Sequence, residues 1–422
     1  MAPVLEELIE NREFEDFNHE ISKFNDGTSK HLEFTSQNSV LKKIIETVNV
    51  IDHDSCLPGE EDSFFIVNLK EVEKSLHLWH EKLPRIQPFY AVKCNHNIEV
   101  VKYLSGRGVN FDCASKNEIE FILNLGVDPS RIVYANPCKT SSYIRYAHDN
   151  GVNLTTVDNC HELYKIKKYH PNTDILIRII TDDESAQCQL STKFGCDMET
   201  ALEILDVAKE LELNIKGVAF HIGSGATDNQ AIFKAIKDCR EIFDNADNLG
   251  FKLDTVDIGG GFQRESFDTF SSMINYSIDK FFPSTYCESR DLRFIAEPGR
   301  FMVSDAFTLV THVIAKRFDS MIYVNDGVYG NLNCILFDHQ NPIPQLVPLD
   351  TKSLDTKEPS TTSLISYSIY GPTCDGLDKI GDFKLPPVNV GDWLYFENVG
   401  AYTSVASTSF NGFVSDKFIY VE

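Results

Sequence analysis

Long apolar runs are missing from this sequence of 422 residues, and none approaches the roughly 20 residues that a membrane-spanning helix requires. The opening stretch, MAPVLEELIENREFEDF, is acidic and polar and lacks the basic and then apolar pattern of a secretory signal. Positive charge is also scarce, because 39 Lys and Arg residues face 63 Asp and Glu residues, for a net charge of −24. These absences favour a cytoplasmic protein and argue against nucleic acid or an anionic membrane as a partner. The acidic surplus would favour the approach of a cationic small molecule, although solubility alone explains it adequately.

Cysteine pairs at the spacing of a disulfide framework or a zinc site are absent as well. The 11 cysteines are odd in number and scattered, and no two of them form a CxxC pair. We therefore expect reduced thiols in a reducing compartment, and we predict neither a disulfide framework nor a bound metal.

Length and composition indicate an ordinary globular chain that is long enough for two domains, with 42% hydrophobic and 24% charged residues. Residues 1–30 carry eight acidic and three basic side chains. We predict that they form a poorly ordered extension with at most a frayed helix over 4–16. A strand is predicted over 63–67, and apolar residues at helical spacing predict a helix over 69–82.

From residue 88 onward, short β-branched or aromatic runs alternate with helical stretches such as the one over 199–213. The predicted strands are FYAV (89–92), VNFDCA (109–114), RIVYAN (131–136), NLTTVD (153–158), DILIRI (174–179), GVAFHIG (217–223), TVDIGGG (255–261) and RFIAEPG (293–299). Eight strand–helix units over roughly 210 residues are typical of a (β/α)8 TIM-like barrel. A doubly wound open sheet is the alternative, but eight consecutive units favour closure. We assign the barrel to residues 69–305.

The pattern changes after residue 301, where strands follow one another without intervening helices. The predicted strands are 304–318, 320–329, 333–339, 366–372, 391–400 and 418–421, and the Ser/Thr/Asp-rich stretch 351–363 is predicted to be a loop. The sequence therefore predicts a C-terminal all-β domain, which we assign to residues 31–68 and 306–422.

Polar residues gather at one end of the predicted barrel strands. At or just after a strand lie Lys93, Asp112, Arg178, His221, Gly259, Gly260, Gly261, Glu297 and Arg300. The carboxyl ends of barrel strands converge on one mouth, which is where such folds place their active sites. A purely structural barrel would have polar residues at both ends, so the one-sided distribution predicts an active site.

Lys93 closes the strand in PFYAVKCN (88–95), so its amine points toward whatever lies at the strand end. Partial desolvation there disfavours the ammonium form, and we expect a neutral, nucleophilic amine of the kind that forms Schiff bases. A solvated loop lysine is the ordinary alternative. The neighbouring motifs decide between these two interpretations.

Two neighbouring strand ends predict a phosphate site. In DIGGGF (257–262), three successive glycines allow backbone N–H groups to approach an anion, and EPGR (297–300) offers Arg300 to the same phosphate. A tight turn is the alternative for the glycines. Glu297 suits the protonated ring nitrogen of a phosphate-bearing aromatic cofactor, or else forms a structural pair with Arg300. In HIGSG (221–225), an imidazole and a hydroxyl lie at another strand end, where they could stack on the cofactor ring and bind its phosphate.

These and further motifs carry a resemblance to a known family. PFYAVKCN, FDCASKNEIE (111–120), FHIGSG (220–225), DIGGGF, AEPGRF (296–301), VNDGVYG (324–330), GPTCDGLD (371–378) and ENVGAYT (397–403) resemble the eukaryotic-type ornithine decarboxylases. Those enzymes belong to the alanine-racemase-like, fold-type-III enzymes that use pyridoxal 5'-phosphate. The resemblance covers about residues 63–415, and eight ordered motifs make chance agreement negligible.

The resemblance implies roles for individual residues of a homodimer with shared active sites. Lys93 would link to the cofactor, Asp112 would lie beside that link, His221 would stack on the cofactor ring, and Glu297 would pair with its nitrogen. The phosphate would be held by Ser224, Gly259, Gly260, Gly261, Arg300 and Tyr402. Cys374 would return a proton to the substrate carbon, and Asp375 would reach across the dimer to join Asp338 at the distal amine of the substrate. Arg178 and Phe410 would lie near the substrate. Lys193 and Asp378 would form a salt bridge between the subunits.

Asp338 and Asp375, at the distal end of the substrate site, would attract a cationic side chain and repel the second carboxylate of meso-diaminopimelate. The resemblance therefore implies decarboxylation of L-ornithine to putrescine. Mixed lysine/ornithine specificity is one alternative, because lysine is only one methylene longer. A non-catalytic homologue of the antizyme-inhibitor kind is another, although the retained cofactor residues argue against it. Residues 141–163 correspond to the segment where the family's inhibitory antizyme binds, and such control is left open because the segment is only moderately basic.

Overall fold

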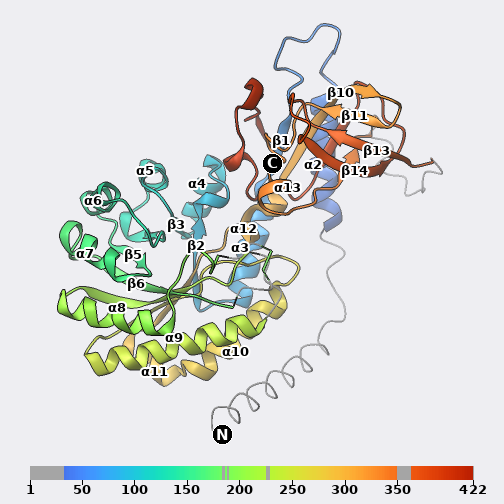
Figure 1. The fold of residues 1–422 in the computed structure, drawn as a ribbon. Coiled ribbons are helices and arrows are strands. Elements are labelled where there is room, and N and C mark those ends of the chain that lie inside the picture. The colour runs from blue at the N-terminus through green and yellow to red at the C-terminus, as the bar shows by residue number, and fades with distance from the viewer. Residues whose placement is uncertain (1–32, 183–185, 188–189, 225–228, 349–362, 422) are drawn as a thin grey trace.

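The computed structural model describes residues 33–182, 186–187, 190–224, 229–348 and 363–421. Eight parallel strands form a closed barrel in chain order, and helices surround it (Figure 1). The barrel strands are β2 (Ile86–Ala91), β3 (Asn110–Cys113), β4 (Ile132–Tyr134), β5 (Leu154–Val157), β6 (Asp174–Ile179), β7 (Asn214–Phe220), β8 (Thr255–Asp257) and β9 (Arg293–Ala296). The helices are α3 (Leu69–Lys82), α4 (Ile98–Gly106), α5 (Lys116–Asn124), α6 (Ser141–Asp149), α7 (Cys160–Tyr169), α8 (Met198–Glu210), α9 (Asn229–Leu249), α10 (Phe267–Phe281), α11 (Ser284–Arg290) and α12 (Arg300–Val303). Barrel closure is thus confirmed.

The barrel strands were recognisable because both of their faces are buried. Inside the barrel, one apolar layer contains Phe89, Val133, Leu154, Leu176, Ala219 and Ile295, one residue from each of six strands. This layer fills the interior, so polar groups at the strand ends lie above a packed floor. Helix α3 has the predicted bounds because Asn68 caps it, accepting a hydrogen bond from the Lys70 N–H at 3.1 Å. Its Trp79 is fully buried and donates to the Ile86 carbonyl at 2.9 Å.

A second, mostly antiparallel sheet lies beside the barrel (Figure 1). It contains β1 (Phe64–Asn68), β10 (Phe307–Arg317), β11 (Met321–Val324), β12 (Pro344–Leu346), β13 (Ile365–Tyr370), β14 (Lys379–Leu385), β15 (Trp393–Phe396) and β16 (Phe418–Val421). Strand β1 pairs antiparallel with β10 and parallel with β16, so the chain visits this sheet before and after the barrel. The assigned domain boundaries stay a prediction, but the two sheets divide the chain along similar lines.

Part of the sequence-based prediction of the second sheet was wrong. The stretch 333–339, predicted as a strand, forms the one-turn helix α13 (Cys334–Phe337). Its four apolar residues are too few to distinguish a strand from a helical turn by periodicity. Helix α2 (Glu33–Val48) and strands β12 and β14 were not predicted. The helix predicted over 4–16 and nearly all of the loop predicted over 351–363 fall outside the described residues.

Across the described ranges, we find no helix with the length and apolar character needed to cross a membrane.

Candidate active site

Lys93 lies at the mouth of the barrel, in a single 3-10 turn (Val92–Cys94) that directly follows β2. Its ammonium donates a hydrogen bond to Asp112 on the neighbouring strand β3. The Asp112 side chain is fully buried, whereas 38% of the Lys93 side chain remains exposed. The lysine is therefore held in place by a buried carboxylate and still accessible from the mouth.

The expected direction of the Lys93 pKa was wrong. Burial does lower it, as the sequence argument assumed, but the charges of Asp112 and Glu297 outweigh burial and raise the pKa above its usual value. The raised pKa favours the ammonium form of Lys93. The sequence could not reveal this, because the two carboxylates come from other strand ends.

Glu297 follows β9 and interacts electrostatically with Asp257, the last residue of β8, and both carboxyl groups are buried. Burial raises the Glu297 pKa well above its usual range, and the charges of Asp112 and Asp257 raise it further. Burial likewise raises the Asp257 pKa to about 6, although the Gly259 N–H donates to Asp257 Oδ1 at 2.9 Å. Sequence reasoning missed Asp257. The available signal was its position as the first acidic residue of the DIGGGF motif.

The glycine triplet packs directly against His221 and Glu297. A Cβ atom on Gly260 would lie 2.8 Å from His221 Nε2 and 2.9 Å from the Glu297 carbonyl oxygen. Gly259 and Gly261 have φ values of +64° and +102°, which side chains rarely allow. Only glycine fits at these positions, because the protein's own backbone and His221 fill the space that a side chain would need. Phosphate binding here stays a prediction.

His221 has a neutral ring. Its Nδ1 accepts a hydrogen bond from the Gly223 N–H at 3.0 Å, so the ring proton belongs on Nε2. Burial lowers the His221 pKa well below its usual value, and the charges of Arg178 and Lys93 lower it further. Arg178, on β6, thus contributes to the same electrostatic cluster. Ser224 follows the same loop and is half-buried.

Arg300, Asp338 and Tyr402 form a second polar group at the mouth. Arg300 Nη2 donates to Asp338 Oδ2 at 2.5 Å, and the guanidinium carbon lies 5.3 Å from the centre of the Tyr402 ring. The Tyr402 N–H donates to the Cys94 carbonyl at 2.9 Å, which attaches this group to the turn that carries Lys93. Arg300 and Asp338, predicted to bind different ligands, are therefore ion-paired with each other.

The residues predicted to act across a dimer form their own cluster in the second sheet region. The Tyr329 hydroxyl donates to Asp375, and the rings of Tyr329 and Phe410 lie 4.6 Å apart. Cys374 is exposed, and its N–H donates to the Asn411 side chain at 2.9 Å.

The two residues of the predicted intersubunit salt bridge have different surroundings within one chain. Asp378 is buried, and its carboxylate accepts backbone N–H groups from Val328 at 2.9 Å and Thr373 at 3.0 Å. Lys193 is exposed, and its ammonium lies 4.9 Å from the centre of the Phe194 ring. A salt bridge between them in a dimer stays a prediction.

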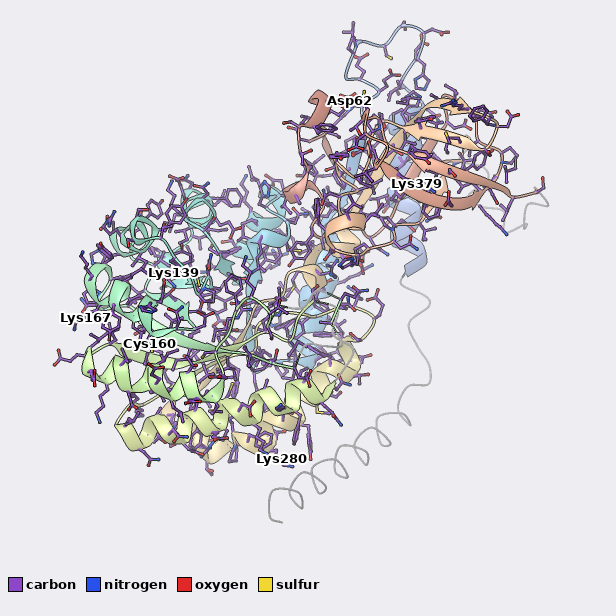
Figure 2. The ribbon with its side chains drawn as sticks, viewed as in Figure 1. Asp62, Lys139, Cys160, Lys167, Lys280 and Lys379 are labelled. Atoms are coloured by element: carbon purple, nitrogen blue, oxygen red, sulfur yellow. The ribbon has the colours of Figure 1, made fainter. Side chains whose placement is uncertain are left out.

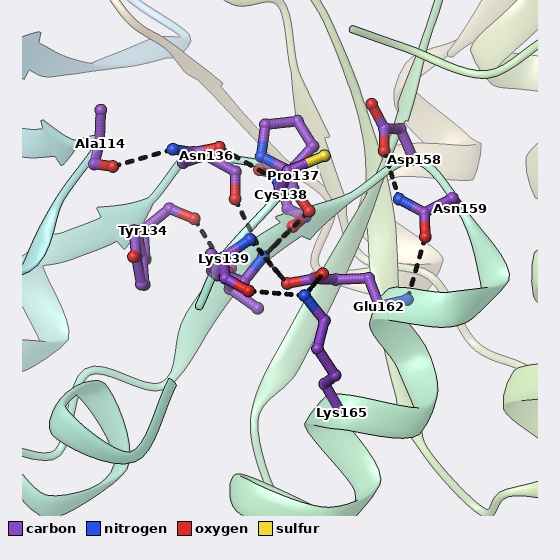
Figure 3. Close-up of polar contacts among 12 residues, drawn as sticks. Ala114, Tyr134, Asn136, Pro137, Cys138, Lys139, Asp158, Asn159, Glu162 and Lys165 are labelled. Atoms are coloured by element: carbon purple, nitrogen blue, oxygen red, sulfur yellow. Dashed lines mark hydrogen bonds and ion pairs between the residues drawn. The ribbon is translucent and has the colours of Figure 1, made fainter. Parts of the chain in front are cut away.

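A second buried lysine, missed by sequence reasoning, lies in the loop after β4 (Figures 2 and 3). The Lys139 ammonium donates to the carbonyls of Asn136 at 2.9 Å and Thr156 at 2.8 Å, and it lies 3.2 Å from Glu162. Lys165 is the other cationic neighbour of Glu162 (Figure 3). Burial lowers the Lys139 pKa to about 8, so this amine loses its proton more easily than Lys93 does. Its contacts nevertheless indicate a structural role, joining the loop after β4 to α7.

Replacement of Lys139 by methionine should destabilise the fold by about 3 kcal/mol, because Glu162 would remain buried with one of its two cationic partners removed. Chemical denaturation of the variant, read by circular dichroism, measures this loss. Lys167→Met, on the same helix as Glu162 but with a side chain that is 40% exposed, is the matched control and should change stability by less than about 0.5 kcal/mol. Equal effects of the two substitutions would contradict the structural role.

Comparison with known proteins places this geometry in a family. A family model described as the pyridoxal-binding domain of pyridoxal-dependent decarboxylases matches residues 69–304. The chain belongs to the pyridoxal-dependent decarboxylase family. The ornithine decarboxylase of Candida albicans is 51% identical to it over 96% of either chain. Antizyme inhibitor 2 of Xenopus laevis is 45% identical over 84% of this chain and 80% of that protein. The solved structure of the Paramecium bursaria Chlorella virus arginine decarboxylase bound to agmatine aligns with a TM-score of 0.82 and 36% identity, covering 91% of this chain and 100% of that one.

The residues at the mouth fit the family's cofactor, pyridoxal 5'-phosphate. Among the described residues, three buried polar atoms here have no hydrogen-bond partner: Asp112 Oδ1, Asp257 Oδ2 and Arg300 Nε. Buried polar atoms are normally paired, so these atoms indicate a polar ligand. A phosphate would pair with Arg300 and with glycine N–H groups, and a positively charged ring nitrogen would pair with the carboxyl cluster.

Proposed function

We propose that this pyridoxal-phosphate-dependent decarboxylase converts L-ornithine to putrescine and CO2. The observation that carries the proposal is the assembly of Lys93, Asp112 and Glu297 at one barrel mouth, in a chain 51% identical to an ornithine decarboxylase. An antizyme inhibitor shares nearly as much identity, so identity alone does not separate catalyst from regulator. Retention of the lysine and of both carboxylates favours the catalyst.

Pyridoxal phosphate supplies a conjugated, positively charged ring that accepts the electron pair left behind when a carboxylate departs as CO2. Lys93 would hold the cofactor covalently, and it would have to lose the proton that Asp112 stabilises before its amine could act as a nucleophile. Glu297 stabilises positive charge at the ring nitrogen. Since its pKa is raised in the cofactor-free protein, a cation beside it is what makes its ionised form favourable.

The remaining residues at the barrel mouth would bind and orient the cofactor. Gly259, Gly260 and Gly261 would offer backbone N–H groups to the phosphate, and Arg300 would supply the cation that pairs with it. Ser224 and Tyr402 complete the phosphate site in this proposal. His221, whose ring stays neutral, offers a flat surface for stacking without adding a charge that would oppose the pyridinium.

Substrate choice depends on the far end of the substrate, where we assign Asp338 and Asp375 to its distal ammonium. Arg178 and Phe410 are the further substrate contacts proposed. An acidic end selects a basic amino acid and disfavours meso-diaminopimelate, which carries a second carboxylate. The protein with the solved structure named above acts on arginine, so the shared fold does not choose among basic substrates.

Initial rates of CO2 release from ornithine, lysine and arginine, measured with purified protein and saturating cofactor, test the proposal. We expect ornithine to exceed lysine by about 10- to 200-fold in kcat/KM, because one methylene discriminates by about 1–3 kcal/mol. Equal or faster turnover of lysine would make the mixed-specificity alternative correct, and no turnover of any of the three would make the regulatory alternative correct.

We further propose a homodimer in which Cys374 and Asp375 of one subunit complete the site of the other. Within one chain these residues contact Tyr329 and Asn411 of the second sheet region, and Cys374 is exposed and available to a partner. In this arrangement the thiol of Cys374 gives the substrate carbon the proton that replaces CO2. Lys193 and Asp378 would then pair between subunits.

Mixing two inactive variants tests the shared site. Lys93→Ala and Cys374→Ala should each be nearly inactive alone, whereas unfolding and refolding them together should recover about a quarter of wild-type activity. This fraction follows because half of the dimers are mixed and each mixed dimer has one intact site. Failure to recover activity, with heterodimers shown by native mass spectrometry, would place both residues in the same subunit's site.

Two further expectations stay predictions: a cytoplasmic location, and binding of an antizyme-type inhibitory protein around residues 141–163. The latter segment comprises α6, the buried strand β5 and the start of α7.

A further inference from the structure

The loop between α2 and β1 brings together three side chains that commonly bind metals. His53, Cys56 and Glu61 each offer one ligand atom, and these atoms all lie within 4.8 Å of one another. His53 Nδ1 is 3.1 Å from Glu61 Oε2. The loop projects from the end of the second sheet, well away from the barrel (Figure 1), so the decarboxylase site does not account for this cluster.

Hydrogen bonds that do not involve these three side chains also hold the loop in position. The Cys56 N–H donates to the Asp52 carbonyl at 2.8 Å, and the Leu57 N–H donates to Glu60 at 2.7 Å. Asn325 connects the loop to the sheet, because its side chain donates to the Glu61 carbonyl at 2.7 Å and accepts from the His312 N–H at 2.8 Å.

A second observation comes from His312 on β10, which lies under the loop. Only 6% of this residue is exposed, yet neither ring nitrogen has a hydrogen-bond partner among the described residues. Its ring stacks on His53 with centroids 4.4 Å apart, and its Nδ1 lies 3.7 Å from Glu61 Oε2. A buried imidazole with two unpaired nitrogens is costly, and metal coordination is a common reason for retaining one.

We propose that His53, Cys56 and Glu61 bind a divalent transition-metal ion of the zinc class, with His312 as the fourth ligand after its ring tilts out of the stack. Tetrahedral zinc with bonds of about 2.0–2.3 Å places its ligand atoms about 3.3–3.8 Å apart, close to the two separations from Glu61 Oε2. One thiolate, one carboxylate and two neutral imidazoles balance a dication, and the thiol proton leaves to solvent on binding.

The ligand set selects the class of ion. Magnesium and calcium prefer oxygen ligands alone, whereas mixed nitrogen, sulfur and oxygen ligands suit zinc and its neighbours. Cysteine spacing gave no sign of this site, because it has a single cysteine and a histidine about 250 residues away in the chain. The ion would fasten the loop to the sheet and stabilise the fold.

Titration of the full-length, untagged holoenzyme with Co²⁺ and Zn²⁺ after chelator treatment tests the site. We expect one ion per chain, a thiolate-to-cobalt absorption band, and displacement of cobalt by zinc. Cys56→Ser should abolish the band, and His53→Gln should weaken binding by at least about tenfold. Cys160→Ser, a half-buried cysteine outside the loop, is the matched control and should bind as the wild type does.

Absence of stoichiometric binding, or unchanged binding by Cys56→Ser, would overturn the proposal. An unchanged cobalt spectrum in folded His312→Gln would overturn the assignment of the fourth ligand. None of these readouts depends on decarboxylation, so failure here is distinguishable from failure of the proposed activity.

Discussion

Replacing Lys93 by alanine should lower kcat by about 10³-fold or more, since the variant loses both its covalent hold on the cofactor and the group that moves protons beside it. The visible absorbance of lysine-bound cofactor should vanish with the activity. Stability should also fall, because the fully buried Asp112 carboxylate loses its cationic partner. Single-turnover kinetics and absorbance spectra of the purified variant measure both effects.

Lys139→Met is the control for this substitution. It removes a buried lysine whose pKa is lower than that of Lys93, but it should retain the cofactor absorbance while losing stability. If Lys93→Ala kept the absorbance and Lys139→Met lost it, the assignment of the two lysines would be reversed.

Replacing Glu297 by glutamine should lower kcat by about 10³-fold, or about 4 kcal/mol of transition-state stabilisation. The amide has nearly the same shape but cannot offer a negative charge to the ring nitrogen. In the wild type, burial and the charges of Asp112 and Asp257 raise the Glu297 pKa, so the carboxylate depends on the bound cation for its ionisation. Steady-state kinetics at saturating cofactor separate this loss from weakened cofactor binding.

Asp257→Asn is the matched comparison for Glu297→Gln. It removes a neighbouring negative charge that raises the Glu297 pKa, so Glu297 should ionise at lower pH in the variant. The acid limb of the pH–rate profile should therefore shift to lower pH, with a smaller loss of kcat than in Glu297→Gln. An equal loss in both variants, without a shift of the profile, would show that Asp257 rather than Glu297 governs the ring nitrogen.

The sequence predicted the barrel well because its signal is local and repeated. Each buried strand reads as a short β-branched or aromatic run, and α3 was predicted with its observed bounds because its apolar residues, Trp79 among them, recur at helical spacing. Helix α13 was mistaken for a strand because four apolar residues carry no period. The convergence of Lys93, Asp112 and Glu297 followed from barrel geometry alone.

The electrostatic state of the site could not be predicted from sequence. Whether the Lys93 pKa rises or falls depends on the balance between burial and two carboxylates on other strands. That balance is set by the tertiary structure. Lys139 was missed for the same reason, because its partner Glu162 lies on a separate helix. Strand ends indicate which residues meet, but not which of them are charged.

Reduction of the cofactor-loaded protein with borohydride, followed by peptide mapping, tests the central claim most directly. The account predicts pyridoxyl modification at Lys93 alone, in the peptide containing PFYAVKCN. Modification at Lys139 or any other lysine, with Lys93 unmodified, would contradict it.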